Sequence, residues 1–119
     1  MAISQSGSQA AAFFRDVCQS SVVWLVRDDN GSRTHLSADG TRSLPFSSTS
    51  PRAQRAAKIW GHGLRFESMR LDTCCDRVLL DAARDGLVIG VNWSGARLVG
   101  WSFTPDDVLN RLSAAHTMT

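Results

Sequence analysis

The chain has 119 residues, of which 43% are hydrophobic and 20% are charged, and its formal net charge is +2 at pH 7. This length fits one domain over residues 1–119, because a chain of this size buries roughly two thirds of its unfolded surface around a single core. The composition favours neither a disordered chain nor a membrane protein. No apolar run is longer than five residues, the length of the run at 22–26, whereas a membrane-spanning helix needs about 20.

The amino-terminal sequence MAISQSGSQAAAFF lacks the basic start and the apolar stretch of a signal peptide. We therefore expect a cytoplasmic protein. The cysteines, Cys18, Cys74 and Cys75, form neither a disulfide framework nor a zinc-ligand spacing. Reduced thiols packed on helices are expected, with no metal and no cofactor.

The amino-terminal part of the chain predicts one helix and one strand. Ser6-Gly7-Ser8-Gln9 matches a capping box, and the apolar residues after it share one face of a helix from about 7 to 19. VVWLVR at 22–27 is rich in β-branched residues and predicts a strand, and the DDNG after it predicts a turn. Residues 33–36 are expected to return as a short partner of that strand.

The middle of the chain predicts two strands around a short helix. RSLPFS at 42–47 is a weaker strand, and Pro45 places it at a sheet edge or a strand end because proline cannot donate to a ladder. A cap and an N1 proline at Ser50-Pro51 begin a helix that ends at Gly61. LRFESMRL at 64–71 alternates apolar and charged residues, which predicts a half-exposed strand.

Two further helices have clear start signals. Asp72 can cap a helix that ends at Gly86 and has an inner face formed by Cys75, Val78, Leu79 and Ala82. The sequence TPDD at 104–107 combines a hydroxyl cap, an N1 proline and acids at the positive end of the helix dipole. The ordered part of the chain is expected to span about 6–113, with a frayed tail after it.

LVIGVNW at 87–93 and RLVGWSF at 97–103 are expected to pair as a tight hairpin across the SGA between them. A two-residue turn would set Gly90 opposite Val99, and the Trp101 ring could then cover the gap over Gly90. A three-residue turn would shift this register by one residue.

The order of these elements shows no regular strand-helix repeat. It therefore predicts an α+β fold with a mainly antiparallel sheet and about four helices, either on one face or split around the sheet.

The segments VVWLVRDDNG, DGTRSLPFSS with SPRAQRA, and DGLVIGVNWSG leading to TPDDVLNRL resemble a bacterial family known as domain of unknown function 2750. The resemblance covers about residues 10–112, and GVNWSG is its most specific part. A fainter similarity to SseB-like domains, which are small α+β modules linked with secretion-associated proteins, lies in LPFSS and DGLVIGVN. The resemblance implies this order of elements and a bacterial cytoplasmic setting, and it assigns no catalytic residue.

Trp93 is the strongest candidate for a contact residue. It continues the alternating apolar residues of the strand at 87–93 up to the hairpin tip, where the sheet is not expected to cover it. Exposed tryptophan is enriched in binding surfaces. We therefore expect Asn92, Trp93 and Arg97 to form a contact surface. The other tryptophans are expected in the core, namely Trp24, Trp60 and Trp101.

No catalytic constellation is visible in the sequence. The histidines, His35, His62 and His116, are too widely spaced for a helical metal pair and are expected in exposed loops, and no nucleophile motif is present. The sequence therefore favours a non-catalytic module that binds an unidentified protein partner, such as an immunity-type or accessory protein.

Two alternatives remain open. An enzyme or small-ligand site could be dispersed over neighbouring strands, formed by Trp24, Arg27, Asn92 and Trp93. Anion or nucleic-acid binding could use the basic segment 52–70, which includes a basic strip on one helix formed by Arg52, Arg55 and Lys58. Nucleic acid is disfavoured because the pI of 8.7 is modest and no aromatic residue is interleaved with these charges.

Overall fold

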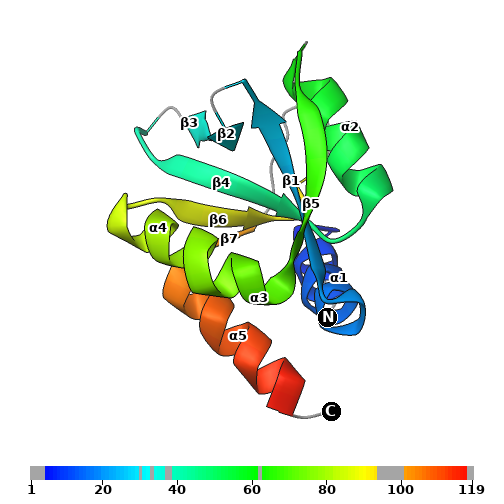
Figure 1. Cartoon of the computed structure of the whole chain (residues 1–119), viewed down its shortest axis with the longest axis vertical. Coiled ribbons are helices and arrows are strands. Elements are labelled where there is room, and N and C mark those ends of the chain that lie inside the picture. The colour runs from blue at the N-terminus through cyan, green and yellow to red at the C-terminus, as the bar shows by residue number, and fades with distance from the viewer. Residues whose placement is uncertain are drawn as a thin grey trace.

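The computed structural model describes residues 5–29, 31–32, 34–36, 39–61, 63–93 and 101–117. The helices are α1 (Gln5–Ser20), α2 (Ser50–Trp60), α5 (Pro105–Thr117) and a continuous helix made of α3 (Leu71–Thr73), a π-helical turn η1 (Cys74–Val78) and α4 (Leu79–Arg84). The strands are β1 (Val22–Asp28), β2 (Gly31–Ser32), β3 (His35–Leu36), β4 (Arg42–Ser47), β5 (Arg65–Arg70), β6 (Val88–Val91) and β7 (Ser102–Phe103) (Figure 1). The α+β prediction is confirmed.

The strands form one mixed sheet in which β5, β1, β4, β6 and β7 lie side by side. Of the six strand pairings among the described residues, only β4 with β6 is parallel. The prediction that residues 33–36 pair with the strand at 22–27 is wrong. Instead, β2 pairs with the end of β1, and β3 pairs with the start of β4. Both short strands lie where β1 and β4 diverge (Figure 1).

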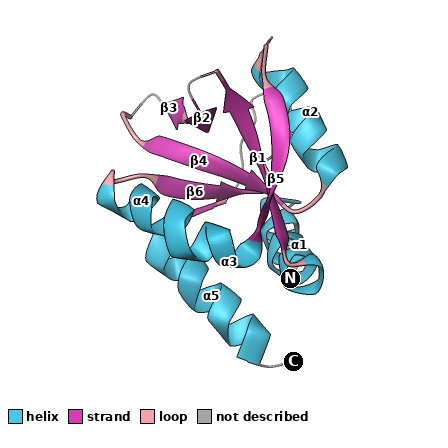
Figure 2. Ribbon diagram, in the orientation of Figure 1, coloured by secondary structure: helices cyan, strands magenta, loops and turns pink. Residues whose placement is uncertain are grey.

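The helices are split between the two faces of the sheet. The main core joins α1, α4 and α5 to one face and includes Phe13, Leu25, Phe46, Leu79, Ile89 and Val108. A smaller cluster on the other face joins Val26 of β1 to Ala56 and Ala57 of α2. Figure 2 shows α2 beside β1 and β5, apart from the other helices. No helix among the described residues is long and apolar enough to span a bilayer.

Pro45 lies in a central strand, so the prediction that it marks a sheet edge or a strand end is wrong. The Phe46 carbonyl oxygen accepts a hydrogen bond from the Asn92 N–H on the β6 side, at 2.9 Å. Successive residues of a strand direct their backbone groups to opposite neighbours, so Pro45 faces β1. The β1–β4 ladder ends at the Leu25–Phe46 pair. The missing N–H of Pro45 therefore costs no ladder bond.

The helix starts agree with the sequence to within two residues. The Thr104 hydroxyl accepts a hydrogen bond from the Asp107 N–H at 3.1 Å, which confirms the cap of α5. In α2 the cap is Thr49 rather than Ser50, because the Thr49 hydroxyl accepts from Arg52 N–H at 3.4 Å. The capping box at Ser6 is wrong, because α1 already begins at Gln5.

A π-helical turn changes the buried face of the helix that begins at Leu71. The Leu79 N–H donates to the carbonyl of Cys74, five residues earlier, instead of four as in an α-helix. The wider turn brings Cys74 and Leu79 to the core, with Cys74 only 1% exposed. The predicted inner face is incomplete, because it leaves out Cys74, whereas Cys75 and Val78 pack against the core and are only partly buried. Cys75 also lines a cavity.

Candidate functional site

Trp93 is buried, and the prediction that its indole is exposed is wrong. Its exposed fraction is 8%, and it packs with Val26, Ala56 and Ala57 under α2. A methyl group at Gly90 would overlap this indole, since its carbon would lie 2.6 Å from Cζ2 and 2.7 Å from Nε1. The indole therefore fills the gap over Gly90 that the sequence assigned to the Trp101 ring.

The backbone conformation of Asn92 ends the alternation of side chains along β6 before Trp93. Its φ is 50°, in the left-handed region, and it directly follows the last residue of β6. This backbone turn carries the next side chain to the face of the sheet opposite to Ile89 and Val91. Strand alternation therefore predicts the wrong face for Trp93.

The Asn92 side chain is 1% exposed and joins three segments of the fold. Its Oδ1 accepts from the Ser48 N–H at 2.8 Å, and its Nδ2 donates to the Ser48 Oγ at 3.0 Å and to the Gln9 carbonyl at 3.1 Å. The Ser48 hydroxyl in turn donates to Asp16 Oδ2 at 2.9 Å. These contacts use the polar atoms of Asn92 inside the protein and leave them no role at an outer surface.

The ladder between β6 and β7 is not the expected tight hairpin. Ile89 pairs with Phe103, and Gly90 pairs with Ser102 rather than with Val99. The Trp101 carbonyl accepts two hydrogen bonds, from the Val91 N–H at 3.2 Å and from the Trp93 Nε1–H at 2.9 Å. The SGA connection and Arg97 lie outside the described residues.

Trp101 is 49% exposed, so the prediction that it lies in the core is wrong. Its ring stacks on Phe103 with the centroids 6.1 Å apart, and Phe103 meets Phe14 of α1 edge to face at 5.6 Å. Together these rings form one side of a groove of about 280 Å³ between α1, β7 and α5. We call this the aromatic groove, and it is lined by Ala10, Ala11, Phe14, Trp101, Phe103 and Arg111.

Among the described residues that line the aromatic groove, Arg111 alone carries a positive charge. Its guanidinium carbon lies 4.6 Å from the centre of the Phe103 ring and 5.9 Å from that of Phe14, which is within the range of cation–π contacts. None of the ion pairs found among the described residues includes Arg111. The groove thus combines a half-exposed indole with a cation that stacks on aromatic rings.

The structure does not bring the four residues of the dispersed site together. Trp24 lies 6.0 Å from Phe66 between ring centres, whereas Arg27 forms an ion pair with Glu67 at 3.2 Å. Phe66 and Glu67 are successive residues of β5, so they point to opposite faces of the sheet. Trp24 and Arg27 therefore face opposite sides, and Asn92 and Trp93 are engaged elsewhere as described above.

The basic strip lies on the outer side of α2. Arg55 and Lys58 are exposed and Arg52 is partly exposed, whereas Ala53, Ala56 and Ala57 are buried against the sheet. This is the ordinary arrangement of a surface helix. The position of these cations favours no ligand over solvent.

The prediction that His35 lies in an exposed loop is wrong. It lies in β3, with its ring 5.5 Å from Trp93 and 6.2 Å from Trp60, and its buried Nδ1 has no hydrogen-bond partner. His62 lies outside the described residues. Among the residues that the structure describes, no three His, Cys, Asp or Glu side chains gather as metal ligands would.

Sequence reasoning missed the aromatic groove. The sequence contains one indication for Phe14, because the apolar pattern puts it on the inner face of the first helix. In the structure it lies at the margin of the core. Arg111 carried none, because an arginine on the outer side of a helix is ordinary. Only the tertiary structure places both beside Trp101.

Comparison with known proteins gives a family. The model of a family described as "Protein of unknown function (DUF2750)" matches residues 10–112, which include every residue of the aromatic groove. A search of curated proteins finds no match. The fainter similarity to SseB-like domains stays a prediction. Because the family model matches most of the chain, this protein belongs to the DUF2750 family.

Proposed function

We propose that this domain is a non-catalytic module that binds another protein through the aromatic groove. The observation that carries the proposal is the half-exposed Trp101 ring, stacked on Phe103 and beside the Arg111 guanidinium. Tryptophan and arginine are the residues most enriched among those that dominate binding energy at protein interfaces. Because Trp93 is buried, the proposed contact surface contains Trp101 instead of Trp93.

The chemistry of the groove indicates what it would bind. Its volume of about 280 Å³ is at the lower limit of small-molecule sites, and it suits one or two side chains of a protein segment. The Trp101 and Phe14 rings favour an aromatic or aliphatic side chain, and Arg111 favours a carboxylate. The proposed partner therefore presents an apolar side chain next to an acidic group.

An immunity-type or accessory protein of the bacterial cytoplasm is the concrete form of this proposal. Such a protein masks or positions its partner by contact alone and needs no catalytic group. The groove lies between three elements that also contribute to the main core, so it is held rigid before a partner arrives. Rigid contact residues lose little conformational entropy on binding.

The test is a selection of random peptides displayed on phage against the purified full chain. We expect the selected peptides to share an aromatic or aliphatic residue beside an aspartate or a glutamate. Trp101→Ala should weaken a selected peptide at least about 30-fold, as loss of a dominant interface tryptophan does. Arg111→Ala should weaken it too and reduce the dependence of binding on salt.

Leu80→Ala is the matched control, because Leu80 is 50% exposed and lies on α4, away from the groove. This variant should bind the peptides as the wild type does. Peptides without a common acidic residue, or equal binding by Trp101→Ala, would contradict the proposal. Binding that depends on Arg55 and Lys58 instead would contradict it as well and would favour the basic strip.

A further inference from the structure

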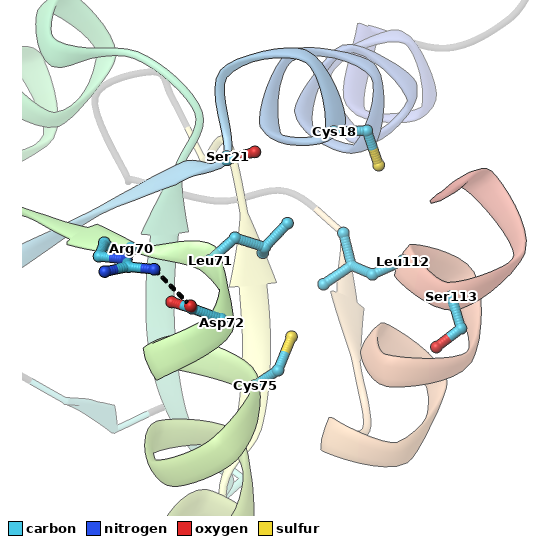
Figure 3. A pocket seen from close by; sticks show the side chains of 8 residues that line it. All are labelled: Cys18, Ser21, Arg70, Leu71, Asp72, Cys75, Leu112 and Ser113. Atoms are coloured by element: carbon cyan, nitrogen blue, oxygen red, sulfur yellow. Dashed lines mark hydrogen bonds and ion pairs between the residues drawn. The ribbon is translucent and has the colours of Figure 1, made fainter. Parts of the chain in front are cut away.

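A second cavity, of about 440 Å³, lies where the end of α1, the start of α3 and the side of α5 meet (Figure 3). It shares no lining residue with the aromatic groove. Its volume is within the range of sites that hold small molecules, roughly 300 to 1,000 Å³. It is therefore large enough for a ligand of its own.

The backbone around this cavity is fixed by two features. Ser21 has a left-handed φ of 59°, its N–H donates to the Val17 carbonyl at 2.8 Å, and its own carbonyl accepts from the Leu71 N–H at 2.8 Å. These bonds tie the end of α1 to the start of α3. The π-helical turn then places Cys74 in the core and Cys75 at its margin, on the cavity wall. The fold itself therefore forms the cavity.

The walls of the cavity are apolar. Figure 3 shows Leu71 and Leu112 facing one another across it, with the Cys18 thiol entering from α1 and the Cys75 thiol from the π-helical turn. Burial raises the pKa of the Cys18 thiol, and burial together with the charge of Asp76 raises the pKa of the Cys75 thiol. Both thiols are therefore neutral at pH 7 and line the cavity as small apolar groups.

The rim of the cavity carries an ion pair between Arg70 and Asp72, both of which line it. The Arg70 side chain is 80% exposed, and its Nη2 donates to Asp72 Oδ2 at 2.7 Å, an ion pair that Figure 3 shows beside Leu71. A guanidinium has five N–H donors, and this contact uses the Nη2 end. The other N–H groups remain directed to solvent, where an anionic head group can accept from them.

We propose that this cavity binds a medium-chain fatty acid, with the hydrocarbon chain between Leu71, Leu112 and the two thiols and the carboxylate on Arg70. Such a ligand has a flexible apolar chain that suits the leucines and thiols, and one carboxylate that can accept from the Arg70 N–H groups not bonded to Asp72. Each further methylene that enters the cavity should tighten binding about fourfold.

The test measures alkylation of Cys18 and Cys75 by iodoacetamide in the full chain, followed by mass spectrometry. Decanoate, used below its micelle concentration, should slow the alkylation of both thiols at least tenfold at saturation. Affinity should rise from octanoate to decanoate to dodecanoate. Unchanged alkylation rates in decanoate, or equal affinities for the three acids, would overturn the proposal.

Two variants test the two ends of the ligand separately. Ser113→Trp places a large side chain at the exposed rim of the cavity and should abolish protection by decanoate. Arg70→Gln should weaken decanoate about tenfold and leave the binding of decanol unchanged. If Ser113→Trp fails to fold, as judged by circular dichroism, Cys18→Trp fills the same space from α1. Protection that persists in a folded, filled variant would overturn the proposal, and Leu80→Ala is the control for both.

Discussion

Trp93 and Trp101 are in direct contact, yet they play opposite parts in the molecule. The Trp93 indole N–H donates to the Trp101 carbonyl at 2.9 Å. Trp93 then closes the small core under α2, whereas the Trp101 ring lies half-exposed on the opposite side of the fold, beside α1 and α5. The same residue type therefore serves the fold at one position and offers a contact surface at the other.

This difference between the two tryptophans shows that the backbone conformation of a single residue can decide on which face of a sheet the next side chain lies. Trp93 continues the apolar alternation of Ile89 and Val91, and an extended chain would have carried it to the hairpin tip. The left-handed Asn92 ends the strand and returns the indole over Gly90. Of these two tryptophans, Trp101 rather than Trp93 is therefore the exposed one.

The largest expected effect comes from removing each ring in turn. Trp93→Ala should lower the free energy of unfolding by about 3–5 kcal/mol, because it empties a packed site. Trp101→Ala keeps the backbone carbonyl that accepts from Trp93 and should cost about 1 kcal/mol, mainly the stacking on Phe103. Urea unfolding of both variants measures the difference. Equal losses would show that the two tryptophans do not differ in this way.

Asn92→Ala should destabilise the protein by about 3 kcal/mol. The change leaves the buried Ser48 N–H without its acceptor, removes the hydrogen bond to the Gln9 carbonyl and puts an alanine at a left-handed φ. Asn92→Gly tolerates that φ and should recover about 1 kcal/mol of the loss. Urea unfolding separates the two parts, and equal stability of both variants would argue against a role for the backbone.

Features with local signals were predictable from the sequence. The β-branched run VVWLVR gave β1, and the Thr104 cap with its following proline gave the start of α5, because each depends on neighbouring residues alone. The α+β class followed from the order of such elements. These parts of the fold needed no knowledge of distant contacts.

The rest depended on contacts between residues far apart in the chain. Pro45 could enter a central strand only because β1 and β4 diverge at that point. Cys74 is fully buried and Cys75 only partly buried because of a π-helical turn, which no local pattern predicted. The candidate site was missed for the same reason, since Arg111 and Trp101 become neighbours only after α5 packs beside α1 and β7.

Gly90→Ala tests the packing of the Trp93 indole on the sheet. The added methyl group would meet the Trp93 ring and should cost about 2 kcal/mol, because the packed indole cannot move aside. In a Trp93→Ala background the same change should cost little. A double-mutant cycle by urea unfolding measures the coupling. Equal costs in both backgrounds would mean that the indole does not cover Gly90.

The buried thiol of Cys74 and the partly buried thiol of Cys75 allow a similar comparison through the pH dependence of stability. This is the smallest of the expected effects. Burial, with the nearby charge of Cys75, raises the pKa of Cys74 from 9.0 to about 12. The folded state holds this proton more tightly than the unfolded state, so the stabilisation is complete below pH 9 and is lost between about pH 9 and 12. At pH 10 the wild type should have lost about 1 kcal/mol that Cys74→Ala retains.

Denaturant unfolding at pH 8 and pH 10 measures this loss, and the comparison of the wild type with Cys74→Ala cancels the contributions of the groups that the two proteins share. Cys75→Ala is the informative control, because Cys75 is only partly buried, on a cavity wall at the margin of the core. Its removal should flatten the pH dependence less than removal of Cys74. The opposite order would place the buried thiol at position 75, as the unbroken helical pattern had predicted, and would argue against the π-helical turn.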